Sequence, residues 1–545
     1  MAGYADSDAL TVFYSLMTIY TIFLAIKYSS KKWFISIPLY ALAAVTNLIY
    51  IFNWGAGWFS SLLFLAFIPA FIVFRLLEEM WHQKKFKFHW KNLQGDTKNI
   101  FVPLVIIFIL INGAGYLLGF NTMFHSLIGG LAFTGIGGEP LIVNISVAEL
   151  QTVNIFTLNG FYSVASRVGL LPTILTLIGL PILALYKFFR REKINYVEVF
   201  LFLWALVTFY LILKGVRFSL LFSIAAGISS GYVIGNIFNY LKNKNILLLS
   251  SISAILLIFI LSSISSAYQI GYSSGAGLTI GQNWYGALDW LKANGDNNTL
   301  VATWWDPGHI ITGYTGLKVH ADGAHCNAAS CIPYNHNTRI QDMGRLMSTD
   351  NETESIQIVK KYTHLTEDQC NAARQKYGEI MPVDACDDIS KVYIIASDDL
   401  IGKYFWMNCF GTFDNNLYNS SGGKQWNCDQ RNYINIPLTT VDKQGLPIYT
   451  LNSLTIGLVP NGTSLLAVVN SPGQGIRSAV VSDVVYFQNG VMQRVKVNST
   501  NMVDGMVFVD PSFRQIIFMD SKIRDSIFTR MFFFNGQGLD KYQLV

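Results

Sequence analysis

The chain has 545 residues, of which 52% are hydrophobic and only 13% are charged, and its mean hydropathy is +0.36. Soluble globular proteins usually carry about 25% charged residues, so this composition excludes a wholly soluble protein and indicates a membrane protein. The net charge of +5 is modest for this length, and the basic residues lie in short clusters between apolar runs. This distribution argues against nucleic acid as a partner.

Eight apolar runs are long enough to cross a bilayer as helices. They lie near residues 10–28, 35–53, 57–77, 99–119, 168–187, 196–214, 218–240 and 246–268. Lysine and arginine cluster in the loops after the first, third, fifth and seventh runs, as is typical of cytoplasmic loops. We therefore expect the amino terminus, the long loop 120–167, the connection from Lys214 to Arg217, and everything after residue 269 to be extracytoplasmic.

Beyond about residue 275 the composition becomes polar and mixed, which predicts a soluble α/β domain attached to the last span. Here we expect a helix over 284–292, a buried strand over 299–303 and a hairpin over 484–497 closed at Asn489-Gly490. The predicted division is therefore a transmembrane domain over 1–272 and an extracytoplasmic domain over 273–545. No Asn-X-Ser/Thr sequon falls in a loop predicted to be cytoplasmic; the sequons are at Asn144, Asn297, Asn351, Asn419, Asn461 and Asn498.

Cysteine usage points to the same compartment. All six cysteines follow the last apolar run, and an even number confined to one segment fits disulfides in an oxidising environment. Cys326 and Cys331 are close enough in sequence to pair locally. Free thiols are the alternative interpretation.

The stretch from Thr303 to His309 reads Thr-Trp-Trp-Asp-Pro-Gly-His. The Pro-Gly turn holds the carboxylate of Asp306 beside the large flat side chains of Trp304 and Trp305, an arrangement that can grip a small hydroxyl-bearing ligand. The alternative is that the two tryptophans anchor the domain to a neighbour or to the membrane interface.

Polar residues in the membrane half are candidates for chemistry. Asp6 and Asp8 stand two residues apart before the first run, where they can bind one hard cation or simply cap a helix. Glu149 ends the stretch Ser-Val-Ala-Glu in the outer loop. Arg217 lies between two runs, where a guanidinium can clamp a phosphate or anchor the helices by snorkelling.

Two further groups lie in the polar domain. The first group is the stretch from Asp399 to Met407, which reads Asp-Leu-Ile-Gly-Lys-Tyr-Phe-Trp-Met and includes Lys403. Taken by itself, this stretch predicts a helix with an amphipathic face. The second group consists of His309, His320, His325 and Asp322. These side chains could form a zinc site, but this is the weaker prediction, because their spacing matches no compact zinc-binding pattern.

Taken together, these motifs resemble those of the catalytic subunit of oligosaccharyltransferase, of the single-subunit type. Trp-Trp-Asp-Pro-Gly resembles the family's WWDYG signature, departing at Pro307. The stretches around Asp6, Glu149 and Arg217 resemble the family's second acidic motif, its SVSE or TIXE motif and its LKGxRF-like segment. Asp399 to Met407 resembles the DK-type motif, with one extra residue before Lys403, and favours an archaeal source.

The resemblance implies a polytopic α-helical membrane domain of the GT-C type followed by a soluble mixed α/β extracytoplasmic domain, in a multi-pass protein of the cell membrane. It implies transfer of a glycan from a polyprenyl-(di)phosphate carrier to the asparagine of sequons in acceptor polypeptides. Catalytic carboxylates would be Asp6 and Glu149, and Mg²⁺ or Mn²⁺ would be held by Asp6, Asp8 and Glu149. Arg217 would bind the donor phosphate; the acceptor would be bound by Trp304, Trp305, Asp306, Lys403 and Met407.

Two alternatives remain at this point: another polyprenyl-phosphate-dependent GT-C glycosyltransferase, which would not prefer sequons, and an inactive fragment or binding subunit. Family members carry more spans and a first outer loop with a further metal-binding aspartate ahead of the second acidic motif. We therefore expect a sequence that starts late at Met1 and, lacking that aspartate, has little or no activity as given.

Overall fold

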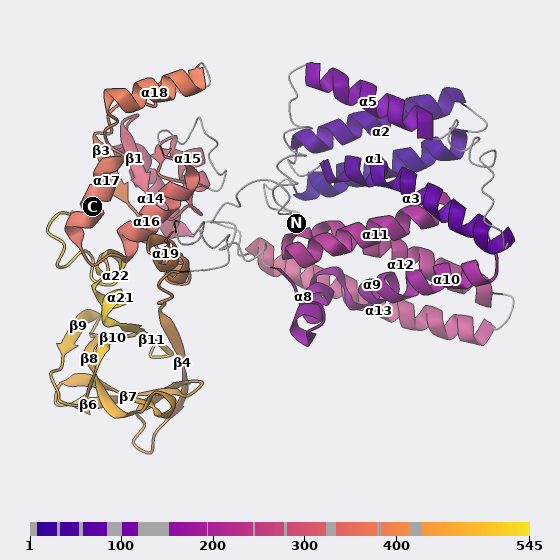
Figure 1. The fold of residues 1–545 in the computed structure, drawn as a ribbon. Coiled ribbons are helices and arrows are strands. Elements are labelled where there is room, and N and C mark those ends of the chain that lie inside the picture. Colours follow the sequence, from indigo (N-terminus) through magenta and orange to yellow (C-terminus); the bar gives the residue numbers. More distant parts are fainter. Residues whose placement is uncertain are drawn as a thin grey trace. The chain divides into compact units, whose positions relative to one another are not determined.

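The computed structural model divides into two compact units, Met1–Thr279 and Ile280–Val545 (Figure 1). Each unit has a hydrophobic core of its own. The predicted boundary at residue 272 lies inside a helix, α13 (Ile246–Ala276). The residues described are 8–29, 33–53, 58–83, 101–117, 152–192, 195–242, 246–276, 281–322, 334–378, 381, 383–414, 416 and 427–545.

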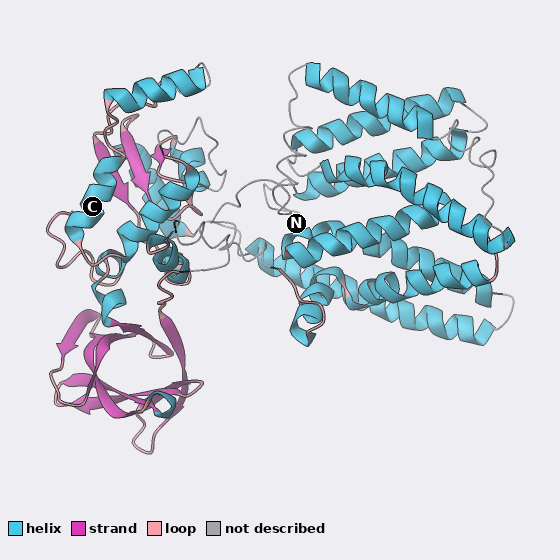
Figure 2. Cartoon of the chain, in the orientation of Figure 1, coloured by secondary structure: helices cyan, strands magenta, loops and turns pink. Residues whose placement is uncertain are grey.

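The described part of the first unit is helical, as Figure 2 shows. Its elements are α1 (Asp8–Ser29), α2 (Trp33–Asn53), α3 (Trp58–Gln83), α5 (Val102–Leu117), α8 (Leu158–Val168), α9 (Leu170–Ile174), η4 (Leu175–Gly179), α10 (Leu180–Phe189), α11 (Tyr196–Lys214), η5 (Val216–Phe218), α12 (Ser219–Leu241) and α13.

All eight predicted runs coincide with helical segments. Six segments of the described chain are long and apolar enough to cross a membrane: Leu10–Ser29, Trp33–Phe52, Leu170–Phe189, Tyr196–Lys214, Ser219–Leu241 and Ile246–Gln269. The other two predicted runs fall on α3, which carries an Arg75–Glu78 ion pair of 2.6 Å, and on α5, which has 16 residues.

Aromatic rings join these helices. Phe200 of α11 is fully buried and contacts Phe23 of α1 and both Phe64 and Phe67 of α3, with ring centroids 5.0–5.5 Å apart. Lipid is as apolar as the helices, so close packing of this kind, rather than removal from water, holds helices together in a bilayer.

The second unit begins with an α/β region around a three-stranded parallel sheet of order β2-β1-β3. Its central strand, β1 (Thr299–Ala302), is buried along its whole length, which confirms the predicted strand. The flanking elements are α14 (Gln282–Asn294), α15 (Gly308–Thr315), β2 (Lys318–Val319), α16 (His336–Ser348), α17 (Glu352–Lys361), α18 (Glu367–Tyr377), β3 (Lys391–Ile394), η7 (Asp398–Leu400) and α19 (Tyr404–Gly411).

Alternating β1 side chains meet different helices. Val301 packs with Leu288 and Leu291 of α14 and Ile311 of α15. Leu300 and Ala302 lie beside residues of α16 and α17. Because both faces of β1 are covered, the strand reads as a continuous apolar run.

A β region follows. Its eight-stranded sheet has the order β10-β11-β4-β5-β6-β7-β8-β9, and a parallel pairing of β10 with β8 closes the sheet on itself. The strands are β4 (Ile434–Val441), β5 (Pro447–Leu451), β6 (Leu454–Asn461), β7 (Ser464–Ser471), β8 (Ile476–Gln488), β9 (Val491–Lys496), β10 (Met502–Val509) and β11 (Gln515–Asp520).

Between β7 and β8 lies a short turn, η8 (Pro472–Gln474), and the predicted hairpin is β8 with β9. Its turn residues Asn489 and Gly490 have φ of 53° and 76°, the positive values that a type I′ turn requires. After β11, the helices α21 (Ser521–Asp525) and α22 (Ile527–Phe532) return to the α/β region, where the Ile527 amide donates to the Thr349 carbonyl at 2.8 Å.

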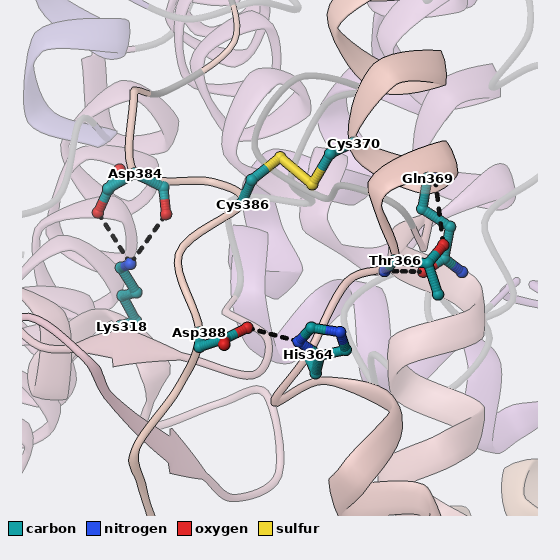
Figure 3. The surroundings of a disulfide bond; sticks show 8 residues. All are labelled: Lys318, His364, Thr366, Gln369, Cys370, Asp384, Cys386 and Asp388. Carbon is teal, nitrogen blue, oxygen red and sulfur yellow. Dashed lines mark hydrogen bonds and ion pairs between the residues drawn. A yellow bond between two sulfur atoms is a disulfide. The ribbon is translucent and has the colours of Figure 1, made fainter.

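Two disulfides confirm the predicted oxidised state for four of the cysteines: Cys370–Cys386 and Cys409–Cys428. Figure 3 shows the first, which ties α18 to the segment before β3. That segment is also held by an ion pair of 2.9 Å between Lys318 and Asp384. Cys326 and Cys331 lie outside the described residues.

Candidate active site

The Trp-Trp-Asp turn begins where β1 ends. The Thr303 hydroxyl donates to the carbonyl of Ile395 at 3.2 Å, so this turn and the segment after β3 leave the sheet together. Carboxyl ends of parallel strands meet at one edge of a sheet, and ligands of α/β folds commonly bind there.

The two tryptophans have different environments. Trp304 is 2% exposed and stacks on Phe410 of α19, with ring centroids 6.2 Å apart and an interplanar angle of 15°. Trp305 is only partly buried. Trp304 therefore anchors α19 to the turn within the second unit, a packing role different from the predicted alternatives of a neighbouring domain or the membrane interface, and Trp305 is the more exposed member of the pair.

The Pro-Gly step turns the chain into α15. A side chain at Gly308 would place its Cβ 2.3 Å from the Ala321 carbonyl oxygen and 2.8 Å from the Cβ of Asp322. Only glycine fits this close approach, and the approach fixes the position of the turn that carries Asp306.

Asp306 lies in an ion-pair network. The Nζ of Lys403 is 3.2 Å from Asp306 Oδ2 and 2.8 Å from Asp399 Oδ2, so one ammonium joins the turn after β1 to the segment before α19. Burial raises the pKa of Asp306 above its ordinary value of 3.8, although the Lys403 charge opposes that shift. Burial also disfavours the charged form of Lys403, but the hydrogen bond to Asp399 and the two carboxylate charges outweigh it and raise the pKa of Lys403.

The crossing of α16 with α19 fixes the position of α19. A Cβ at Gly344 of α16 would lie 2.4 Å from the Met407 carbonyl oxygen, and one at Gly411 of α19 would lie 2.5 Å from the Arg345 amide nitrogen. The absence of side chains at these two glycines lets the helix backbones touch. The Met407 side chain is fully buried beside this contact, unlike Asp306 and Lys403, whose side chains are 33% and 34% exposed.

Sequence reasoning missed several residues that shape this site. Ser397 donates its hydroxyl to Asp399 Oδ1 at 2.5 Å and so orients the second carboxylate beside Lys403. Phe410 provides the face on which Trp304 stacks. The glycine inside α16 was an available signal, because an isolated glycine in a helical pattern often marks a close packing contact.

The predicted residues of the membrane half are only partly described. Asp8 is the first residue of α1, and Arg217 lies in η5, the short connection between α11 and α12. Asp6 and Glu149 fall outside the described residues. Within the described ranges, the structure therefore assembles Trp304, Trp305, Asp306, Lys403 and Met407 in one region, whereas two of the three members of the predicted carboxylate cluster lie outside those ranges.

The zinc alternative has little support in the part of the chain that the structure describes. There, no three histidine, cysteine or acidic side chains gather as a metal-binding group. His320 is buried, its Nε2 lies 2.8 Å from the Arg339 carbonyl oxygen, and burial lowers its pKa to about 3. His309 and Asp322 approach to 3.8 Å, and His325 lies outside the described residues.

Comparison with known proteins gives concordant results. The family model for oligosaccharyl transferase STT3, N-terminal, matches residues 1–280. A dolichyl-phosphooligosaccharide-protein glycotransferase of Methanocaldococcus jannaschii is 25% identical over 441 residues, covering 62% of this chain and 44% of the relative. One from Methanococcus voltae is 22% identical over 440 residues, covering 65% and 47%. The chain thus spans less than half the length of these relatives.

A crystal structure of the Archaeoglobus fulgidus oligosaccharyltransferase, tethered to an acceptor peptide containing an NVT sequon, has a similar fold. Its TM-score is 0.53 at 15% identity, covering 98% of this chain and 61% of that one. The apolar helices, the sheet-containing second unit and this likeness define a polytopic membrane protein of GT-C architecture with a soluble α/β domain. The family match extends over more than half of the chain. The chain belongs to the STT3 oligosaccharyl transferase family, which confirms the family resemblance seen in its motifs.

Proposed function

We propose that this chain is an oligosaccharyltransferase that moves a glycan from a polyprenyl-(di)phosphate carrier to the asparagine of Asn-X-Ser/Thr sequons. The observation that carries the proposal is the partly buried Asp306 carboxylate, held beside Lys403 at the edge of the parallel sheet, in a chain whose membrane half matches the family. The named activities of its relatives support the same reaction.

In this proposal, the acceptor hydroxyl binds at the Trp-Trp-Asp turn. Asp306 accepts the hydrogen bond of the serine or threonine hydroxyl, and the exposed part of Trp305 packs against the acceptor backbone. Lys403 keeps the Asp306 carboxylate in its charged, accepting form, because a nearby cation favours ionisation. A site built to pair that hydroxyl discriminates strongly against an acceptor that lacks it. Trp304 and Met407 contribute from within the core, by fixing the turn and α19.

The chemical step would take place at the membrane unit. Asp6 and Glu149 would accept hydrogen bonds from the acceptor amide, and Arg217 would bind the donor phosphate. Asp6, Asp8 and Glu149 supply only carboxylate oxygens, a donor set that suits Mg²⁺ or Mn²⁺, and such a cation would offset charge on the departing phosphate. We place this unit in the cell membrane and the second unit outside the cytoplasm; the loop charges and the disulfides support that orientation.

A double-mutant cycle between protein and peptide tests the central contact. The affinity of a fluorescent peptide containing Asn-X-Thr is measured for the unaltered chain and for Asp306→Ala, and again with a peptide in which valine replaces the threonine. Each single change should weaken binding by about 1–3 kcal/mol, because it leaves a polar partner unpaired. Both changes together should cost little more than one.

Additive losses in this cycle would show that Asp306 does not bind the hydroxyl. Glycopeptide formation from a polyprenyl-diphosphate-linked oligosaccharide, followed by mass spectrometry, tests the reaction itself, and a measurable rate would contradict the expectation from the sequence that the chain has little or no activity as given. Equal glycosylation of the threonine and valine peptides would contradict sequon-directed transfer.

A further inference from the structure

The second unit carries acceptor sequences of its own. Four of its sequons lie within the described residues, at Asn297, Asn351, Asn461 and Asn498. A sequon can enter a pocket that reads its hydroxyl only if its asparagine amide and its serine or threonine hydroxyl can both leave the surrounding fold. The four sites differ sharply in this respect.

The side chains of the sequon at Asn498 can leave the surrounding fold. It forms the loop between β9 and β10, and its three residues, Asn498, Ser499 and Thr500, are all exposed. Hydrogen bonds fix the loop at both ends: the Val497 amide donates to the Ser482 carbonyl at 2.8 Å, and the Asn501 carbonyl accepts from the Val480 amide at 3.0 Å. Within the described structure, no hydrogen bond engages the side chain of Asn498 or Thr500.

The sequon at Asn297, by contrast, is held within the fold. Its threonine, Thr299, is the first residue of β1 and is fully buried. The Thr299 hydroxyl donates to Asp296 Oδ1 and accepts from the Asp296 amide, both at 2.9 Å. Releasing this hydroxyl would require β1 to leave the centre of the parallel sheet.

The other two sequons are held by local structure. Asn351 caps α17, with its Oδ1 accepting from the amides of Thr353 and Glu354, and the Thr353 hydroxyl accepts from Lys541 at 2.9 Å. Asn461, Gly462 and Thr463 are exposed, like the Asn498 sequon, but they form the tight two-residue turn of the β6–β7 hairpin, in which the backbone of Asn461 pairs with that of Ser464. The Asn351 cap would have to open, and the Asn461–Ser464 pairing would have to break, before an acceptor pocket could take either asparagine.

We propose that Asn498 is a glycosylation site of the folded protein, modified by a copy of this same chain. The inference rests on the oligosaccharyltransferase activity proposed above. In the step, a bond forms between Asn498 Nδ2 and the anomeric carbon of the glycan as the bond from that carbon to the carrier phosphate oxygen breaks. The polyprenyl (di)phosphate leaves with the electron pair, and the amide nitrogen gives up one proton to solvent water.

The test compares the same sequons inside and outside the fold. The full chain, purified folded and unglycosylated, is incubated with a polyprenyl-diphosphate-linked oligosaccharide and Mn²⁺ together with synthetic peptides of residues 294–303 and 494–503. Mass spectrometry then measures glycan occupancy at each asparagine. We expect both peptides to be modified at comparable rates, but occupancy in the folded chain to be about tenfold or more higher at Asn498 than at Asn297, because a buried strand opens only rarely.

Two variants of the loop sharpen the comparison. Thr500→Val removes the hydroxyl that the pocket reads and should abolish modification at Asn498, whereas Ser499→Ala changes the unread middle position of the same exposed loop and should leave it intact. Modified peptides with an empty Asn498 would overturn this inference but leave the proposed function standing. Two unmodified peptides would reject the proposed function and this inference with it. Equal occupancy at Asn297 and Asn498 in the folded chain would show that the fold does not select the site.

Discussion

Replacing Lys403 by methionine removes the cation between two carboxylates while keeping much of the side-chain volume. The Lys403 Nζ lies 3.2 Å from Asp306 and 2.8 Å from Asp399, and the three side chains are 33–40% exposed. At this exposure solvent screens the pair, so its contribution is limited to about 1 kcal/mol. Because the Lys403 charge favours the ionised form of Asp306, the substitution should raise the pKa of Asp306 further.

The affinity of a sequon peptide, measured as a function of pH, reports this change. The carboxylate form of Asp306 accepts the hydroxyl hydrogen bond more strongly than the protonated form does. Binding is therefore tightest above the pKa of Asp306, which burial raises above 3.8, and weakens as the pH falls through it. In Lys403→Met the weakening should occur at a higher pH than in the unaltered chain.

A matched control removes an ion pair of the same length elsewhere. Lys391 lies 3.2 Å from Asp296 at the other end of β3, so Lys391→Met should leave the pH profile of peptide binding unchanged. A profile for Lys403→Met that stays in place, or that moves to lower pH, would refute the assignment of Asp306 as the hydroxyl acceptor.

Three further predictions concern substitutions at other positions. Trp304→Ala should lower the free energy of unfolding by about 3–5 kcal/mol, since it removes a buried ring, whereas Trp305→Ala should reduce peptide affinity more than stability; equal losses of stability would contradict their different roles. Gly344→Val should destabilise the second unit by about 2–3 kcal/mol in thermal unfolding because its Cβ meets backbone at 2.4 Å, while Gly313→Ala, with no atom within 4 Å, should be neutral. Asp8→Ala should abolish dependence on divalent ions but not peptide affinity, since the acceptor pocket lies in the other unit; loss of both would mean that Asp8 is structural.

The membrane unit could be predicted well because its signal is local. A run of apolar residues of the right length forms a helix whatever its neighbours are, since every backbone group in a bilayer must be satisfied within the segment. The β region could not be predicted beyond one hairpin. Asn489-Gly490 specifies its turn locally, but the closure of the sheet pairs β10 with β8 in parallel, and no short sequence pattern encodes such a contact.

The candidate site shows the same contrast. The Trp-Trp-Asp turn and the segment around Lys403 were recognisable as motifs, but their contact depends on how β1 and β3 pair, which their spacing along the chain does not reveal. Periodicity also could not separate the two adjacent tryptophans. Which ring is buried depends on Phe410, a residue of a helix far along the chain.

The hydrogen bond between Thr303 and Ile395 joins residues 92 positions apart. Chains are synthesised at about 5–20 residues per second, and domains fold as they are made. The turn carrying Asp306 is therefore made about 5–20 s before the segment that holds Lys403. During that interval Trp304 has no Phe410 to stack on, and the carboxylate has no ammonium beside it. The acceptor pocket is therefore a late product of biosynthesis: the nascent chain exposes two adjacent tryptophans until α19 has been made.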